Sequence, residues 1–275
     1  MREFFYDQSI GAIAGVLVVA MAIGTEAGHR LGRGVGSRSD DEPYRSHING
    51  LQGSLLGVLA LLLGFTLSLA LQRFDHRSEA VVEEANAIGT AFLRSQILTP
   101  GLRDEVLKSF HRYIDLRVRE DAISLERTEQ REKLLGEAGV ARNELWDQAR
   151  RAAALDPNMV TTGLYIQSLN DAIDAFGRRE AAHRRHVPEV ALILLVGTLL
   201  ASGWMVGLTS GIAGHRPSVA TYVLSTLILL LLLIIIDLDR PRRGLIQIDQ
   251  SSMVELKAEI DSAVATGAAS PVAVP

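Results

Sequence analysis

The sequence predicts an all-α membrane protein with four transmembrane helices and a cytoplasmic helical domain inserted between the second and third spans. Four stretches contain no charged residue: residues 8–25, 48–72, 190–214 and 217–236. Each is close to the roughly 20 residues that a helix needs to cross ~30 Å of hydrocarbon. A densely charged block, residues 73–187, separates the second stretch from the third. No part of that block shows the sustained alternation of polar and apolar residues that is typical of strands.

These observations divide the chain into four parts. Residues 1–72 contain the first two spans and an external loop, and residues 73–187 form the cytoplasmic helical domain. Residues 188–236 contain the last two spans. Residues 237–275 are a cytoplasmic tail, for which we expect a short amphipathic helix and a disordered end.

The first span has two interpretations. Small residues around Met21 resemble the cleavage site of a signal peptide. Glu3 and Asp7, however, are unusual before the apolar core of a signal peptide, so we favour a retained transmembrane helix. Residues 32–40, which are rich in Gly, Ser and Arg, predict a flexible external loop after it.

Basic residues near the span ends predict the orientation. Ten arginines lie on the side of the charged block and the two termini, and five lie on the other side. Because the side with more Lys and Arg stays in the cytoplasm, both termini and the charged block are expected there. We therefore predict a multi-pass protein of the bacterial inner membrane.

Small residues distinguish the spans from one another. The first and third spans carry glycines at four-residue spacing, and the second carries a small-residue stripe, whereas the fourth is rich in Leu and Ile. The stripe of the second span consists of Gly53, Gly57, Ala60, Gly64 and Ser68. Small faces let helices approach closely in a membrane, so we expect a central, protein-packed second helix and a lipid-facing fourth one. An oligomeric bundle and packing within one chain both agree with this pattern.

A bulky apolar stripe on the second span is a candidate pore lining, because rings of such residues gate channels by dewetting. It consists of Leu55, Val58, Leu62, Phe65 and Leu69. Arg73 and Arg77 follow the span and would place positive charge at the pore mouth, which favours anions. The same stripe could instead face lipid or a neighbouring helix.

The charged block is expected to be helical throughout. Apolar residues continue the 3.6-residue period of the second span, which predicts one helix that runs to about Leu98. Thr99 and Pro100 are typical of the start of the next helix. Two more helices are predicted over residues 125–154 and 159–186, with a turn at residues 156–158.

No catalytic, cofactor or metal site is predicted, and the charge pattern gives no reason to expect binding to nucleic acid. The seven histidines are scattered without ligand spacing, and the chain has no cysteine. Glu83 and Glu84 could hold a cation, but adjacent helix residues point apart, so a solvated face is favoured. Glu26 and Arg30 are four residues apart and are expected to pair near the outer interface. We therefore do not expect an enzyme.

Several segments resemble the signature of a bestrophin-like family of bacterial membrane proteins of unknown function. The most specific is the run Asp-Leu-Asp-Arg-Pro that begins at Asp237. The residues that carry the resemblance are Glu84, Asn86, Gly89, Asn170, Asp174, Arg178, Asp237, Asp239, Arg240 and Pro241. The resemblance implies a distant similarity to bestrophins, which are pentameric ion channels with a pore lined by the second helix.

Two functions follow as hypotheses. The first is an oligomeric ion channel, pentameric by analogy, whose partners are the lipid bilayer, ions and further copies of the chain. It could prefer anions, with Leu62, Phe65 and Leu69 as the constriction. The alternative is a non-conducting membrane-anchored scaffold or sensor whose cytoplasmic helices bind a partner.

Overall fold

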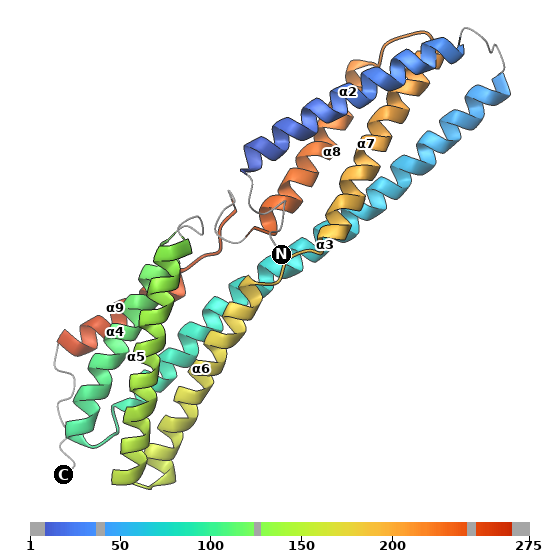
Figure 1. The fold of residues 1–275 in the computed structure, drawn as a ribbon. Coiled ribbons are helices and arrows are strands. Elements are labelled where there is room, and N and C mark those ends of the chain that lie inside the picture. Colours follow the sequence, from blue (N-terminus) through green and yellow to red (C-terminus); the bar gives the residue numbers. More distant parts are fainter. Residues whose placement is uncertain (1–8, 37–41, 124–127, 241–245, 266–275) are drawn as a thin grey trace. The chain divides into compact units, whose positions relative to one another are not determined.

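The computed structural model describes residues 9–36, 42–123, 128–240 and 246–265. Over these residues the predicted all-α class is confirmed, because they contain helices and no strand. Four of the helices are long and apolar enough to cross a membrane. The chain divides into two compact units (Figure 1). The first takes the residues up to Arg73 and from His186 to Arg240, and the second takes residues 74–185 and those from Gln247 onward.

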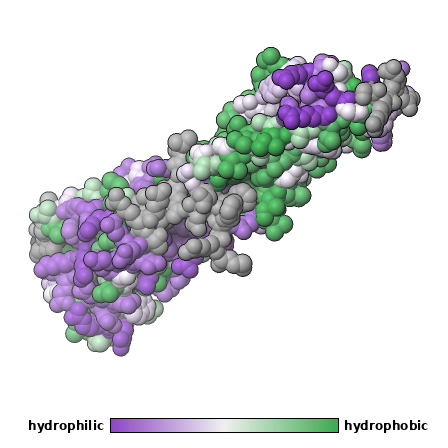
Figure 2. All heavy atoms as spheres, turned by 45° about the horizontal axis from the view of Figure 1, so that its top comes forward, coloured by the Kyte–Doolittle hydropathy of each residue, from purple (hydrophilic) through white to green (hydrophobic). Residues whose placement is uncertain are grey.

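The first unit contains the four charge-free stretches on four helices. These are α2 (Ile10–Gly36), the first part of α3 (Glu42–Ser95), α7 (Glu189–Ile212) and α8 (Val219–Leu238). On the face that Figure 2 shows, hydrophobic side chains cover most of this unit, and hydrophilic ones gather at one end of it. The Ser218 hydroxyl accepts a hydrogen bond from the Thr221 amide at 3.3 Å and caps the start of α8.

Helix α2 is longer than the sequence predicted. It continues through Gly36, so the prediction of a flexible loop from residue 32 is wrong for residues 32–36; residues 37–41 lie outside the described residues. The physical reason is a helix contact. A Cβ atom on Gly32 would collide with the carbonyl oxygen of Leu208 on α7. The glycine is there to allow close approach of two helices rather than to make a loop flexible.

Helices α2 and α7 touch along their glycines. A Cβ atom on Gly28 would collide with the Trp204 carbonyl oxygen, and one on Gly207 would collide with the Thr25 carbonyl oxygen. Gly211 faces the backbone of α2 in the same way. The four-residue glycine spacing of the first and third spans therefore marks a backbone-to-backbone contact within one chain.

The second unit is a helical bundle with a mostly hydrophilic surface (Figure 2). Its helices are the second part of α3, α4 (Pro100–Asp121), α5 (Thr128–Leu155), the π-helical turn η1 (Met159–Gly163), α6 (Leu164–His183) and α9 (Ser251–Ala265). The single helix that the sequence predicted to run to about Leu98 is confirmed, ending at Ser95. Pro100 begins α4 as predicted. Residues 124–127, where α5 was expected to begin, lie outside the described residues.

One continuous apolar core holds this bundle together. Phe92 of α3 and Phe110 of α4 pack edge to face with ring centroids 6.0 Å apart. The tail helix α9 joins the same core through Met253, Leu256 and Ile260. The expected disordered end, residues 266–275, lies outside the described residues.

The predicted helix over residues 159–186 is divided in two. The turn at residues 156–158 is confirmed, and the Asn158 side chain accepts a hydrogen bond from the Val160 amide at 2.8 Å. A π-helical turn follows, and α6 ends at His183 rather than His186. The chain then needs a non-helical segment before Pro188, because a residue that precedes proline avoids the helical region.

Candidate functional site

The apolar stretch of α3 buries one face within the first unit. Leu59, Leu63 and Ala70 are almost fully buried, and Thr66 is buried with them. Leu59 also lines a small cavity together with Leu199 of α7 and Leu224 of α8. The alternating spacing of four and three residues is a heptad-like signal that predicts such a contact, and our reading of the sequence missed it.

The candidate pore residues lie next to this buried face. Two of them are on the exposed side of the helix, and three are at its edge. Phe65 is 68% exposed and Val58 is 51% exposed. Leu55, Leu62 and Leu69 are half-buried at the edge of the contact. The described part of the first unit therefore leaves Val58 and Phe65, the two most outward bulky residues of the stripe, uncovered.

The small-residue stripe of α3 is open as well. A Cβ atom on Gly53, Gly57 or Gly64 would meet no atom of the described residues within 4 Å. Of the two alternatives for this stripe, packing against the other helices of the same chain is not seen among the described residues, and packing between chains stays a prediction. The reason is that a different face of the helix, the buried one at heptad spacing that includes Leu59 and Leu63, makes the contact inside the unit.

The two arginines after the apolar stretch differ. Arg73 is half-buried, whereas Arg77 is 1% exposed. The Arg77 guanidinium donates hydrogen bonds to the carbonyl oxygens of Ala182 at 3.3 Å and Arg185 at 2.7 Å. A cation at this position satisfies and stabilises the carbonyl end of α6.

Farther along α3, the signature residue Glu84 is the centre of a buried ionic network. Its two carboxylate oxygens accept hydrogen bonds from the Arg117 guanidinium of α4, both at 2.9 Å. Both side chains have no exposed area. The expectation of a solvated face is therefore wrong for Glu84, because an arginine 33 residues away compensates its charge. Glu83 is exposed, as expected.

The network links four helices. Arg179 of α6 binds Glu84 at 2.7 Å and Asp121 of α4 at 2.6 Å. Arg117 also binds Glu120 at 2.9 Å, and Glu120 binds Arg131 of α5 at 2.6 Å. Buried charges of this kind are stable only when each has a partner, so the network fixes the positions of these helices around the continuation of α3.

The electrostatics of the network follow from burial and charge pairing. Burial alone would lower the pKa of the Arg117 guanidinium, but the Glu84 carboxylate raises this pKa above its ordinary value. Burial, and then the Glu84 charge, raise the pKa of the Tyr113 hydroxyl. These groups therefore keep one protonation state at neutral pH, which suits a structural role.

The remaining signature residues divide into exposed and buried groups. Asn86, Asn170, Asp174 and Arg178 are exposed, and Arg178 pairs with Glu83 at 3.4 Å. Gly89 packs against α9, since a Cβ atom there would lie 3.3 Å from the Leu256 side chain. Asp237, Asp239 and Arg240 are buried, and Pro241 lies outside the described residues.

The two buried aspartates hold the chain at the ends of the last two spans. The Asp239 carboxylate accepts a hydrogen bond from the Val187 amide at 2.8 Å, just before α7. The Asp237 carboxylate accepts one from the Ile246 amide at 2.9 Å. They therefore fix the entry to α7 and the exit from α8. Among the described residues, no three His, Cys, Asp or Glu side chains come together where they could hold a metal ion.

Comparisons with known proteins agree with this architecture. A family model described as the bestrophin-like domain matches residues 16–253. No curated protein matches the chain. A crystal structure described as that of a membrane protein, in a proline-to-alanine variant, matches with a TM-score of 0.58 and 12% sequence identity. The match covers 90% of this chain and 98% of that one, and at this identity it shows a shared fold.

Proposed function

Since the chain belongs to the bestrophin-like family, we propose that this membrane protein is an oligomeric ion channel with the uncovered face of α3 around the pore. Family membership supports the class of function. The pore lining and the ion preference have to be argued from the site itself. The proposed assembly is a ring of identical chains, pentameric by analogy with bestrophins.

The observation that carries the proposal is the exposure of α3. The helix packs on its own unit through Leu59 and Leu63, while Val58 and Phe65 on another face are uncovered. The open glycines lie on a third face, where a small surface would let a neighbouring copy approach closely. In a ring, copies of α3 could thus contact one another through small residues and present Phe65 to the axis.

Charge at the end of the apolar stretch supports a preference for anions. Arg73 follows the stretch directly and has no ion-pair partner among the described residues. Arg77 is engaged with the end of α6, so the proposed pore mouth depends on Arg73 alone. A ring of such cations would attract anions.

A second candidate function has support from the second unit. Leu155, Met159 and Val160 are 68%, 76% and 68% exposed at the turn between α5 and η1. Exposed apolar patches are typical of contact surfaces. A scaffold or sensor that binds a partner through this turn would explain the patch without ion conduction.

Current through planar bilayers tests the channel. The purified chain should conduct, and Phe65→Ala should increase the single-channel conductance because it removes a bulky constriction. Val223→Ala on α8 is the matched control, since Val223 is also about half exposed and should not face the pore. If neither the natural chain nor Phe65→Ala passes current in an oligomeric preparation, the channel proposal fails.

A further inference from the structure

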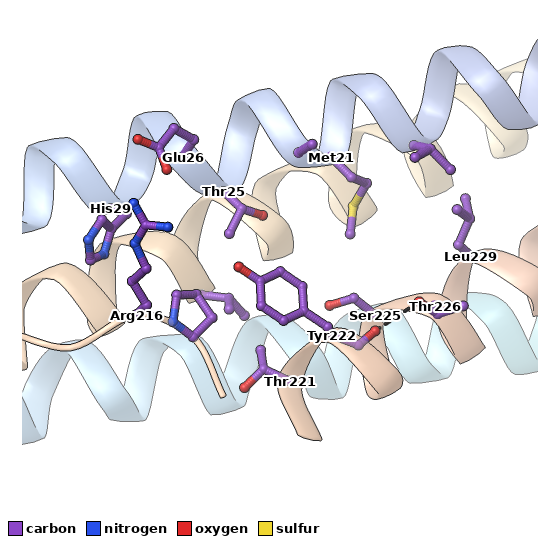
Figure 3. Close-up of a pocket in the computed structure, with 14 residues that line it drawn as sticks. Met21, Thr25, Glu26, His29, Arg216, Thr221, Tyr222, Ser225, Thr226 and Leu229 are labelled. Atoms are coloured by element: carbon purple, nitrogen blue, oxygen red, sulfur yellow. Dashed lines mark hydrogen bonds between the residues drawn. The ribbon is translucent and has the colours of Figure 1, made fainter. Parts of the chain in front are cut away.

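The first unit contains a cavity of about 250 Å³ between α2 and α8, with part of α7 at its side. Figure 3 shows its two different ends. One end is more apolar and is lined by Val18, Met21 and Leu229. The other end carries Glu26, His29, Arg216 and Tyr222. The cavity is therefore amphipathic along its length.

Several polar groups at this cavity have no partner among the described residues. His29 is only 7% exposed, and its Nδ1 atom makes no hydrogen bond there. In Figure 3 the Arg216 guanidinium lies near the His29 ring, and the Tyr222 hydroxyl is directed toward the same end. A buried polar group without a partner costs free energy, so the buried His29 ring indicates a polar ligand, and the more exposed Arg216 and Tyr222 lie where they could bind the same ligand.

The charge balance indicates the sign of that ligand. Glu26 is the one acidic residue that lines the cavity, and Arg30 already binds it at 2.7 Å. This pairing confirms the prediction from the four-residue spacing. Arg216 forms no ion pair within the part of the chain that the structure describes. Its charge acts on the nearby Glu26 carboxylate without direct contact. A guanidinium whose N–H donors remain available suits a carboxylate or a phosphate.

We propose that this cavity binds an amphiphile with one anionic head group, a carboxylate or a phosphate, and an apolar chain. The head group would bind Arg216, His29 and Tyr222. The apolar chain would follow α2 from Glu26 toward Val18, a distance of about 12 Å at 1.5 Å per residue. Fatty acids and anionic phospholipids share this chemistry, and both are available to a protein that lies in a bilayer.

Native mass spectrometry of the full-length chain in detergent tests the proposal with four separate probes. These are oleate, dioleoyl phosphatidylglycerol, dioleoyl phosphatidylcholine and inorganic phosphate. Either anionic amphiphile should be retained at one molecule per chain, and the arm with the stronger retention identifies the source. Equal retention of the zwitterionic lipid, or retention of phosphate alone, would overturn the proposal.

Paired variants place the binding in the cavity. Arg216→Gln should weaken retention about tenfold or more, because it removes a charge-assisted contact. Its control is Arg33→Gln, an exposed arginine of α2 outside the cavity. Ala22→Leu should fill the cavity and abolish retention, whereas Ala27→Leu, on the same helix but outside the cavity, should not.

Unchanged helix content and an unchanged thermal unfolding midpoint without probe would show that each variant still folds. Retention that is equal in the natural chain and in both cavity variants would overturn the proposal. Retention of the probe by monomers but not by oligomers would also overturn it, because a second copy of the chain would then occupy the cavity.

Discussion

Two adjacent glutamates of α3 show how strongly the surroundings decide what a residue does. Glu83 is more than half exposed and pairs with the equally exposed Arg178. Glu84 is fully buried between two guanidiniums that come from residues 33 and 95 positions away. An exposed pair of this kind contributes less than about 1 kcal/mol. A buried charge that loses its partner, in contrast, costs about 3–5 kcal/mol.

This contrast predicts the effects of two substitutions. Glu84→Ala leaves Arg117 and Arg179 buried without their shared carboxylate, so the free energy of unfolding should fall by about 3–5 kcal/mol. Glu83→Ala should lower it by less than about 1 kcal/mol. Denaturant unfolding of the detergent-solubilised chain, followed by circular dichroism, measures both. Similar losses for the two variants would contradict the central role of Glu84.

At the scale of helices, glycines at similar spacing serve different purposes. On α2 and α7 they bring two backbones into contact within one chain. On α3 they face open space, and the contact inside the unit is made by Leu59 and Leu63 instead. A stripe of small residues therefore identifies a helix that another helix can approach closely. Which helix approaches it can be seen only in the structure.

Substitutions of two glycines on α2 distinguish a glycine in a helix contact from a glycine that faces open space. Gly28→Ala should destabilise the chain by about 1–3 kcal/mol, because the new Cβ atom collides with the Trp204 carbonyl oxygen and α7 has to shift. Gly15→Ala on the same helix meets no atom within 4 Å and should have no destabilising effect. Thermal unfolding midpoints compare the two. A loss at Gly15 equal to the loss at Gly28 would show that an unseen neighbour covers α2.

The helices could be predicted from the sequence, whereas most contacts of the candidate site could not. Runs without charge identified the spans, and the continued apolar period identified the extension of α3, because both are local patterns. Glu84 could not be recognised as buried, because its partners Arg117 and Arg179 lie on other helices. Gly32 suggested a loop for a similar reason, since its contact on α7, Leu208, lies 176 residues further along the chain.

At the scale of the whole molecule, the orientation in the membrane connects the proposals to one another. The excess of arginine near the charged block predicts that the second unit lies in the cytoplasm. Arg73 would then mark the cytoplasmic mouth of the pore. The amphipathic cavity, with Arg216 at the opposite end of the spans, would face the outer leaflet. An inverted orientation would exchange both assignments.

Because the natural chain has no cysteine, single introduced cysteines can report this orientation without background. Asn158→Cys lies at the exposed turn before η1, and His215→Cys lies in the exposed segment between α7 and α8. A membrane-impermeant maleimide should label His215→Cys in bacterial spheroplasts and should label Asn158→Cys only after permeabilisation. The opposite pattern would place the second unit outside the cytoplasm. Ser218→Cys, an exposed residue near His215, should match His215→Cys, so that the result does not depend on one side chain.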